Sequence, residues 1–188
     1  MTSTTAGRNL ATKAKVAGLV GIGEELIIDC NTIPTFPEGV GVRNVERHYP
    51  QGRIPWSPVH FFLFRTREQR GVNDTPTTRG LRTVSTHRIM AAMNAKRQVG
   101  VNAGVYNFFK TDERRVLIPT DVGSVSTISF PGTLFEGACG RTVVAQFSLI
   151  KGIWTPDFRD LADDWGPGDA VLVFSRRALA NLDIKIPA

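Results

Sequence analysis

Short segments rich in β-branched and aromatic residues, each closed by Pro, Gly, Asn or Asp, recur along most of this sequence and limit what it can fold into. Such segments are typical of β-strands that end at turns. About eight or nine strands are expected, and no regular alternation of strand and helix indicates a parallel doubly wound sheet. We therefore predict an all-β fold, an antiparallel sandwich or barrel. The segments are EELIIDCNTI, GVGVRNVERHY, VHFFLFRT, GVYNFFKT, RRVLIPT, SVSTISFPG, RTVVAQFSLIKGIW, DAVLVFSRR and LDIKI.

Two segments have the pattern of short helices in loops. In residues 86–98, Ile89 and Met93 fall on one face, and Lys96 and Arg97 suit the carboxyl end of a helix. The segment PDFRDLADDW, residues 156–165, predicts a second, shorter helix. Residues 59–66, VHFFLFRT, are apolar on both faces and predict a strand in the middle of a sheet. The side chains expected in the core are Phe61, Leu63, Leu117, Val143, Phe147, Val171 and Val173.

The chain of 188 residues is long enough for one domain with its own core. Residues 1–22 begin with a polar stretch, MTSTTAGRNLATKAK, and predict an N-terminal arm, whereas residues 23–188 predict the folded body. We expect Cys30 and Cys139 to be buried free thiols, because two cysteines are too few for a disulfide framework. No signal peptide or membrane segment is expected, which predicts an intracellular product.

Positive charge is concentrated in the middle of the chain. Residues 43–115 carry fourteen basic and five acidic residues, whereas residues 1–42 have a net charge of −1 and residues 116–188 one of −2. Seventeen of the 23 basic residues are arginine, whose planar fork binds phosphate with two hydrogen bonds. A polyanion partner, most simply nucleic acid, explains this pattern, and a merely basic protein without such a partner is the alternative.

The apolar strand VHFFLF leads directly into a loop rich in arginine, glycine and asparagine, RTREQRGVNDTPTTRGLR. Such a loop places charge at the margin of a sheet, where it can contact phosphates without reading bases. Few aromatic residues lie within the loop, so stacking on bases is not expected. The predicted binding is electrostatic and tolerant of sequence. The candidate nucleic-acid-binding residues are Arg65, Arg67, Arg70, Arg79 and Arg82 of the loop, with Arg8, Lys13 and Lys15 of the arm.

The sequence carries no motif of a known catalytic centre. His48, His60 and His87 lie on different predicted elements, without the HExxH spacing of zinc enzymes. Neither the GxSxG motif nor the phosphate-binding GxxxxGK[ST] motif is present. Cys139 lies near Arg141, which could lower the pKa of a thiol, but a structural cysteine in a turn is the preferred interpretation. We therefore expect no catalytic residues, metal or cofactor.

An acidic cluster near the C-terminus has three interpretations. On the predicted helix its aspartates fall near one face, where they form a solvated surface, share a cation through oxygen ligands, or pair with arginines of a neighbouring copy. Aromatic residues interspersed with charge are typical of subunit contacts. The candidate interface residues are Trp154, Asp157, Phe158, Asp160, Asp163, Asp164 and Trp165.

Three stretches resemble single jelly-roll viral coat proteins, the group of satellite tobacco necrosis virus and small circular single-stranded DNA viruses. FFLFRTREQRG resembles a strand that enters an Arg/Asn/Gly loop, SVSTISFPGTLFEG a late strand with a Pro-Gly turn, and GPGDAVLVFS the entry to a late strand. The resemblance implies an eight-stranded antiparallel jelly roll with one or two short helices. It also implies a capsid subunit that self-assembles, packages nucleic acid, needs no membrane and resides in the virion after assembly in a host cell.

Other functions fit the same composition. A monomeric nucleic-acid-binding β-barrel would have the same charge without self-association. A phage structural or tail component would self-assemble without nucleic acid, and an enzyme of unrecognised type is the third alternative.

Overall fold

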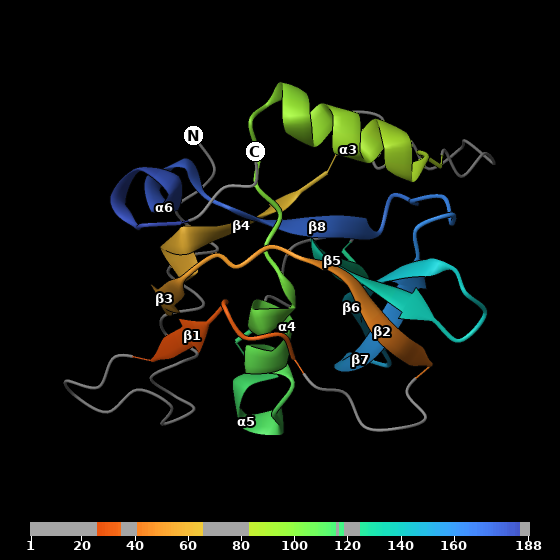
Figure 1. Ribbon diagram of the computed structural model, residues 1–188, viewed down its shortest axis with the longest axis horizontal. Helices are drawn as coiled ribbons and strands as arrows, with labels where there is room; N and C mark the ends of the chain where they lie inside the picture. The colour runs from red at the N-terminus through yellow and green to blue at the C-terminus, as the bar shows by residue number, and fades with distance from the viewer. Residues whose placement is uncertain (1–25, 35–40, 66–82, 116, 119–124, 185–188) are drawn as a thin grey trace.

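The computed structural model describes residues 26–34, 41–65, 83–115, 117–118 and 125–184. In these residues the chain is mostly β, with short helices, and its strands form two sheets (Figure 1). The small sheet pairs β1 (Ile27–Asp29) with β3 (Arg53–Pro55). The large sheet has six strands in the order β4 (Phe61–Phe64), β8 (Asp169–Phe174), β5 (Thr127–Gly137), β6 (Thr142–Ile150) and β7 (Ile153–Asp160), and β2 (Val42–His48) pairs with β5 beside this path. The helices are η1 (Pro58–His60), α3 (Thr86–Ala95), α4 (Ala103–Phe109), α5 (Asp112–Arg115) and α6 (Arg176–Asn181).

The long strand β5 changes partners along its length. Its first residues pair with β8, and its residues from Thr133 onward pair with β2, with a register shift between Phe130 and Phe135 on its β6 side. Gly132 lies at this change, and a Cβ there would meet Asn102 Cα at 2.8 Å. The missing side chain therefore lets β5 bend and lie directly against the backbone that precedes α4.

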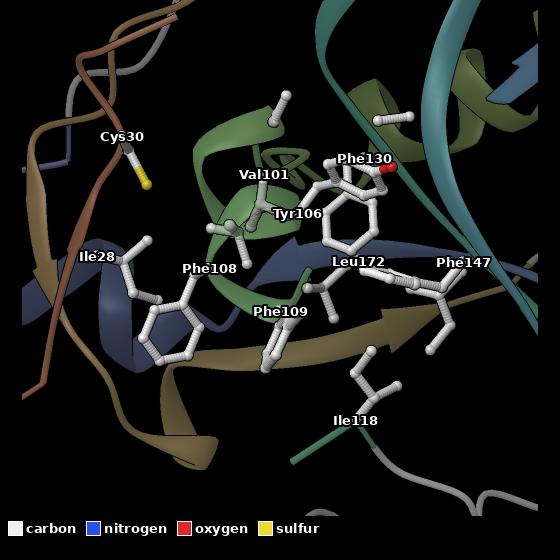
Figure 2. Close-up of a cluster of buried hydrophobic side chains, with 14 of the residues drawn as sticks. Ile28, Cys30, Val101, Tyr106, Phe108, Phe109, Ile118, Phe130, Phe147 and Leu172 are labelled. Atoms are coloured by element: carbon white, nitrogen blue, oxygen red, sulfur yellow. The ribbon is translucent and has the colours of Figure 1, made fainter. Parts of the chain in front are cut away.

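The main core fills the inner side of the large sheet, and α4 lies at its centre. Tyr106, Phe108 and Phe109 of α4 are all buried, and Tyr106 packs on Phe130 and Phe147 with ring centroids 5.7 and 4.9 Å apart (Figure 2). Of the predicted core residues, Leu117, Val143, Phe147, Val171 and Val173 are buried, whereas Phe61 and Leu63 are partly buried and pack against the main core.

A second, smaller cluster lies on the outer side of the same sheet. There α3 covers β8 and β4, and Ile89 and Met93 pack with Phe64 and Trp165 (Figure 1). The sequence-based prediction of this helix and of its buried face is confirmed. Because β8 is covered on both faces, Val171 and Val173 belong to this cluster, and Leu172 and Phe174 belong to the main core.

The prediction of a wholly antiparallel sheet is wrong at one pair. β5 and β8 run parallel, with Thr127 opposite Asp169 and Ser129 opposite Val171. A parallel pair needs a long crossover connection. Here the β6–β7 hairpin connects β5 to β8, and no helix takes part in the connection. The eight-stranded antiparallel jelly roll is therefore not the topology that the described residues form.

Four local predictions are also wrong. Residues 104–111 form α4 and the segment after it, because Asn102 caps the helix by accepting a hydrogen bond from Gly104 N at 2.9 Å and the core takes up its aromatic side chains. Residues 112–115 form α5, and no strand lies in residues 182–184. The predicted helix at 156–165 is instead the second half of β7 and a turn.

Two further expectations need correction. The strand predicted for the middle of the sheet, β4, is at its edge, and its apolar residues are covered by α3 on one face and by the main core on the other. Cys30 is buried as expected, but Cys139 is exposed.

The predicted arm, residues 1–22, lies outside the described residues. Within the described residues no helix is both long and apolar enough to cross a membrane.

Candidate assembly and nucleic-acid surfaces

Arg65 is the one predicted nucleic-acid-binding residue that falls within the described part of the chain. It follows β4, is half-buried, and its Nη1 donates a hydrogen bond to the carbonyl of Pro167 at 3.2 Å. This contact fixes the end of β4 against the loop before β8. The other predicted residues, Arg8, Lys13, Lys15, Arg67, Arg70, Arg79 and Arg82, lie outside the described residues.

Helix α3 adds a basic surface that the candidate residues did not include. Its buried residues face β8, and Arg88, Lys96 and Arg97 at or just after the helix are exposed. No Asp or Glu occurs in the sequence from residue 83 to residue 110. This lack of acidic residues is the sequence signal for the basic surface of α3. The segment begins directly after the predicted arginine loop.

The acidic cluster lies on β7 and on the turn after it, so its carboxylates do not share a helical face. Asp157 accepts a hydrogen bond from Gln146 Nε2 at 2.9 Å, and Asp164 accepts one from Thr83 Oγ1 at 2.9 Å. Asp160 forms an ion pair with Arg141 at 3.1 Å. A hydrogen bond from Ala162 N and the nearby Arg141 lower the pKa of Asp160. Three of these aspartates therefore have partners within their own chain.

The aromatic residues of the predicted interface lie inside the protein. Trp154 and Trp165 are 3% and 1% exposed, and Phe158 is partly buried against the main core. Trp165 donates from Nε1 to Thr86 Oγ1 at 2.7 Å, which ties the turn after β7 to the first residue of α3. These aromatic residues stabilise the fold and are not surface anchors. A contact between the aspartates and a second copy stays a prediction.

The ion pair between Arg159 and Asp169 joins β7 to β8 across the outer face of the sheet. The distance from Nη1 to Oδ2 is 2.8 Å, and the two side chains are 11% and 14% exposed. The guanidinium of Arg159 also lies 4.4 Å from the centre of the Trp165 ring. Because both charges are compensated internally, Arg159 is a structural residue and not a site for an anion.

The outer edge of β7 is protected against the addition of another strand. Counting alternate residues from the hairpin turn places the backbone of residues 154, 156, 158 and 160 on this edge. Pro156 has no N–H, and Phe158 N donates to the side chain of Asp157 at 2.7 Å. The two middle positions of the four therefore offer no free donor to a neighbouring strand, which disfavours the addition of a strand at this edge.

The tip of the β6–β7 hairpin exposes two isoleucines. Ile150 and Ile153, which pair across the turn, are 52% and 62% exposed. The turn between them is Lys151–Gly152, with φ angles of 51° and 80°. The two isoleucines form a small exposed apolar patch at the end of the hairpin. The sequence signal is the IKGI segment between two strand-like stretches.

A wide, open depression lies at the opposite end of the same hairpin. It has a volume of about 560 Å³ and is lined by Glu46, Leu134, Arg141, Thr142, Asp160, Leu161 and Ala162. Leucine and alanine side chains contribute its apolar part, and Glu46, Asp160 and Arg141 contribute its charge. Within the described residues no group of three or more His, Cys, Asp or Glu side chains could hold a metal ion.

Buried polar groups near Cys30 belong to the fold. Burial raises the pKa of the Cys30 thiol to about 12, so the thiolate needed for nucleophilic chemistry is not formed near neutral pH. The Nδ1 atom of His48 lies 2.8 Å from Thr133 Oγ1. Burial lowers the pKa of the His48 imidazole. Thr133 Oγ1 in turn accepts from Ala103 N at 3.0 Å, so His48 helps to fix β2 and β5 to the start of α4.

No protein-family model, curated protein or solved structure matches this chain.

Proposed function

We propose that this protein is a structural subunit that assembles with copies of itself into a shell, as viral coat proteins do, and binds nucleic acid through its arginine-rich middle third. The observation that carries the proposal is exposed apolar surface on a well-packed fold. Ile150 and Ile153 are more than half exposed at the tip of a regular hairpin. Burying such side chains against another molecule is favourable by about 25 cal/mol per Å² of apolar surface.

The proposal concerns the coat function and not the jelly-roll topology. A jelly roll is antiparallel throughout, whereas β5 and β8 run parallel here. Residence in a virion and assembly inside a host cell belong to the same proposal. They are supported by the resemblance of FFLFRTREQRG and GPGDAVLVFS to coat strands.

The monomeric nucleic-acid-binding barrel is less well supported. A barrel closes its sheet so that no edges remain, whereas β4 and β7 form opposite edges among the described strands. A phage structural or tail component would assemble without nucleic acid, so the two parts of the proposal need separate measurements.

We expect the purified protein to sediment as an assembly much larger than 20.6 kDa and to carry nucleic acid. Sedimentation velocity and negative-stain microscopy measure the particle, and the ratio of absorbance at 260 and 280 nm reports the nucleic acid. Large particles without nucleic acid would favour the tail or structural alternative. A protein that stays monomeric at all concentrations, with and without added nucleic acid, contradicts the coat function.

We also expect the combined substitutions Arg67→Ala, Arg70→Ala and Arg79→Ala to weaken nucleic-acid binding. Each lost phosphate contact should reduce the slope of log K against log salt by about one. Arg65 is left unchanged because its side chain donates a hydrogen bond to the carbonyl of Pro167. The measurement is a salt titration of binding to two DNA oligonucleotides of different sequence, with Arg176→Ala and Arg177→Ala on α6 as the matched control. Unchanged affinity and slope in the triple variant would show that the loop does not contact phosphate.

A further inference from the structure

The two ends of the β6–β7 hairpin complement each other in polarity and charge. One end is the tip, in which Lys151 lies between the exposed Ile150 and Ile153. The other end is the depression, where Leu134, Leu161 and Ala162 lie beside Glu46. The tip therefore presents apolar groups with a positive charge, and the depression presents apolar groups with a negative one.

Charge at the depression is net negative. Glu46 and Asp160 contribute two carboxylates, and Arg141 contributes one guanidinium, which is paired with Asp160 at 3.1 Å. Glu46 is exposed and makes no ion pair with any other described residue. A lysine entering the depression would therefore find a carboxylate partner.

The turn at the tip is not the least strained sequence for this hairpin. Lys151 has a φ of 51°, in the left-handed region where glycine and asparagine are more favourable than lysine. Glycine at residue 151 would form the same turn with less strain. Lysine is therefore not required by the turn itself, and its exposed charge is available for a contact.

The tip and the depression of one molecule cannot meet. β6 runs from Thr142, which lines the depression, to Ile150 at the tip. At about 3.3 Å per residue, these ends lie roughly 25 Å apart. Only a second copy, displaced along the hairpin, can place its tip in the depression.

We propose that the tip of the β6–β7 hairpin of one copy inserts into the depression of the next, with Ile150 and Ile153 on Leu134 and Leu161 and with Lys151 paired to Glu46. The proposal rests on the proposed self-assembly and specifies its contact. Because different surfaces meet, each copy makes two such contacts, and the result is a ring, a shell or a filament. The contact is small, so association should be weak per contact and steeply dependent on concentration.

Reversing charge on either side tests the contact. Lys151→Glu gives two negative surfaces, and Glu46→Lys gives two positive ones, so each variant alone should associate at least about tenfold more weakly than wild type. In an equimolar mixture each tip again meets a depression of opposite charge, and association should return. The measurement is sedimentation velocity over a concentration series without nucleic acid. Arg177→Glu, the same reversal of charge at an exposed position of α6, is the control and should associate like wild type.

A variant that associates weakly because it is misfolded is distinguished in two ways. Mixing two misfolded proteins does not restore association, so recovery in the mixture reports the contact itself. Lys151→Gly removes the charge and relieves the strained φ, so its thermal midpoint should equal or exceed that of wild type while its association weakens.

The outcomes separate this contact from the proposed function. If wild type assembles and both single variants assemble equally well, the contact is wrong and self-assembly stands. If the variants lose association and the mixture does not regain it, the pairing of Lys151 with Glu46 is wrong. If wild type itself never associates, with or without nucleic acid, the proposed function fails and the contact fails with it.

Discussion

Replacing Asn102 by alanine is expected to lower the free energy of unfolding by about 2–4 kcal/mol. Asn102 is fully buried and joins three segments. Its Nδ2 donates to the carbonyls of Cys30 at 2.6 Å and Tyr49 at 2.8 Å, and its Oδ1 accepts from Gly104 N at 2.9 Å. Alanine removes the cap of α4 and leaves buried backbone groups without this partner. The carbonyl of Cys30 keeps a hydrogen bond from Gln51 N, which limits the loss.

Chemical denaturation of matched variants measures this effect. Asn107→Ala, at an exposed position of the same helix, is the control and should change stability little. Asn102→Asp retains an acceptor for Gly104 N but loses both donors and places a carboxylate against two carbonyls, so it should be at least as destabilising as alanine near neutral pH. If Asn102→Ala and Asn107→Ala unfolded at the same denaturant concentration, the buried network would contribute little to stability.

The parts of the fold that sequence predicted well are those in which local pattern and burial agree. In α3, Ile89 and Met93 recur at helical spacing and are the residues that the sheet covers. In β5, Gly132 lies at the bend and Gly137 is the last residue, Gly152 is in the turn that follows β6, and Asp169 is the first residue of β8. Such segments need no information from distant parts of the chain.

The errors come from residues whose role depends on tertiary packing. The aromatic residues of α4 favour a strand locally, but the helix is set by the Asn102 cap and by a core that takes up Tyr106, Phe108 and Phe109. The aspartates near the C-terminus fit a helical face, but Ile150 and Ile153 pair across a turn and extend the region into β7. Neither contact can be seen in a single local window.

The candidate surfaces were predictable in charge and not in position. Segment counts located the basic middle third, and the structure shows that Arg88, Lys96 and Arg97 of this segment are exposed on or just after α3. The acidic cluster was recognised, but its partners Gln146, Thr83 and Arg141 are distant in sequence, and pairing with them depends on the fold. The depression was not predicted, since its lining comes from four strands and two turns that only the folded sheet brings together.

Gly104→Ala is expected to be destabilising even though alanine is the better helix former. In α4 the substitution alone would favour the helix by about 1 kcal/mol. A Cβ at this position, however, would clash with the carbonyl oxygen of Asp29 and would lie 2.9 Å from Cys30 Cα. Both are backbone atoms, so relief requires α4 to move away from the strand β1, which disturbs the hydrogen bonds of Asn102. Overpacking of this kind costs about 1–3 kcal/mol or more, so we expect a net loss of stability.

Thermal and denaturant unfolding of Gly104→Ala and Gly166→Ala separates the close contact from a general effect of alanine. A Cβ at Gly166 would meet its nearest neighbour at 3.8 Å, an ordinary van der Waals distance, so this control should remain close to wild type. Hydrogen exchange should also quicken at α4 and β1 in Gly104→Ala, because the two elements must separate to accept the methyl group. If Gly104→Ala were as stable as wild type, α4 would not pack closely enough on β1 for a Cβ at residue 104 to clash with the carbonyl oxygen of Asp29. The gain in helix propensity cannot mask the effect, since it is smaller than the cost of moving two backbone segments apart in a close-packed core.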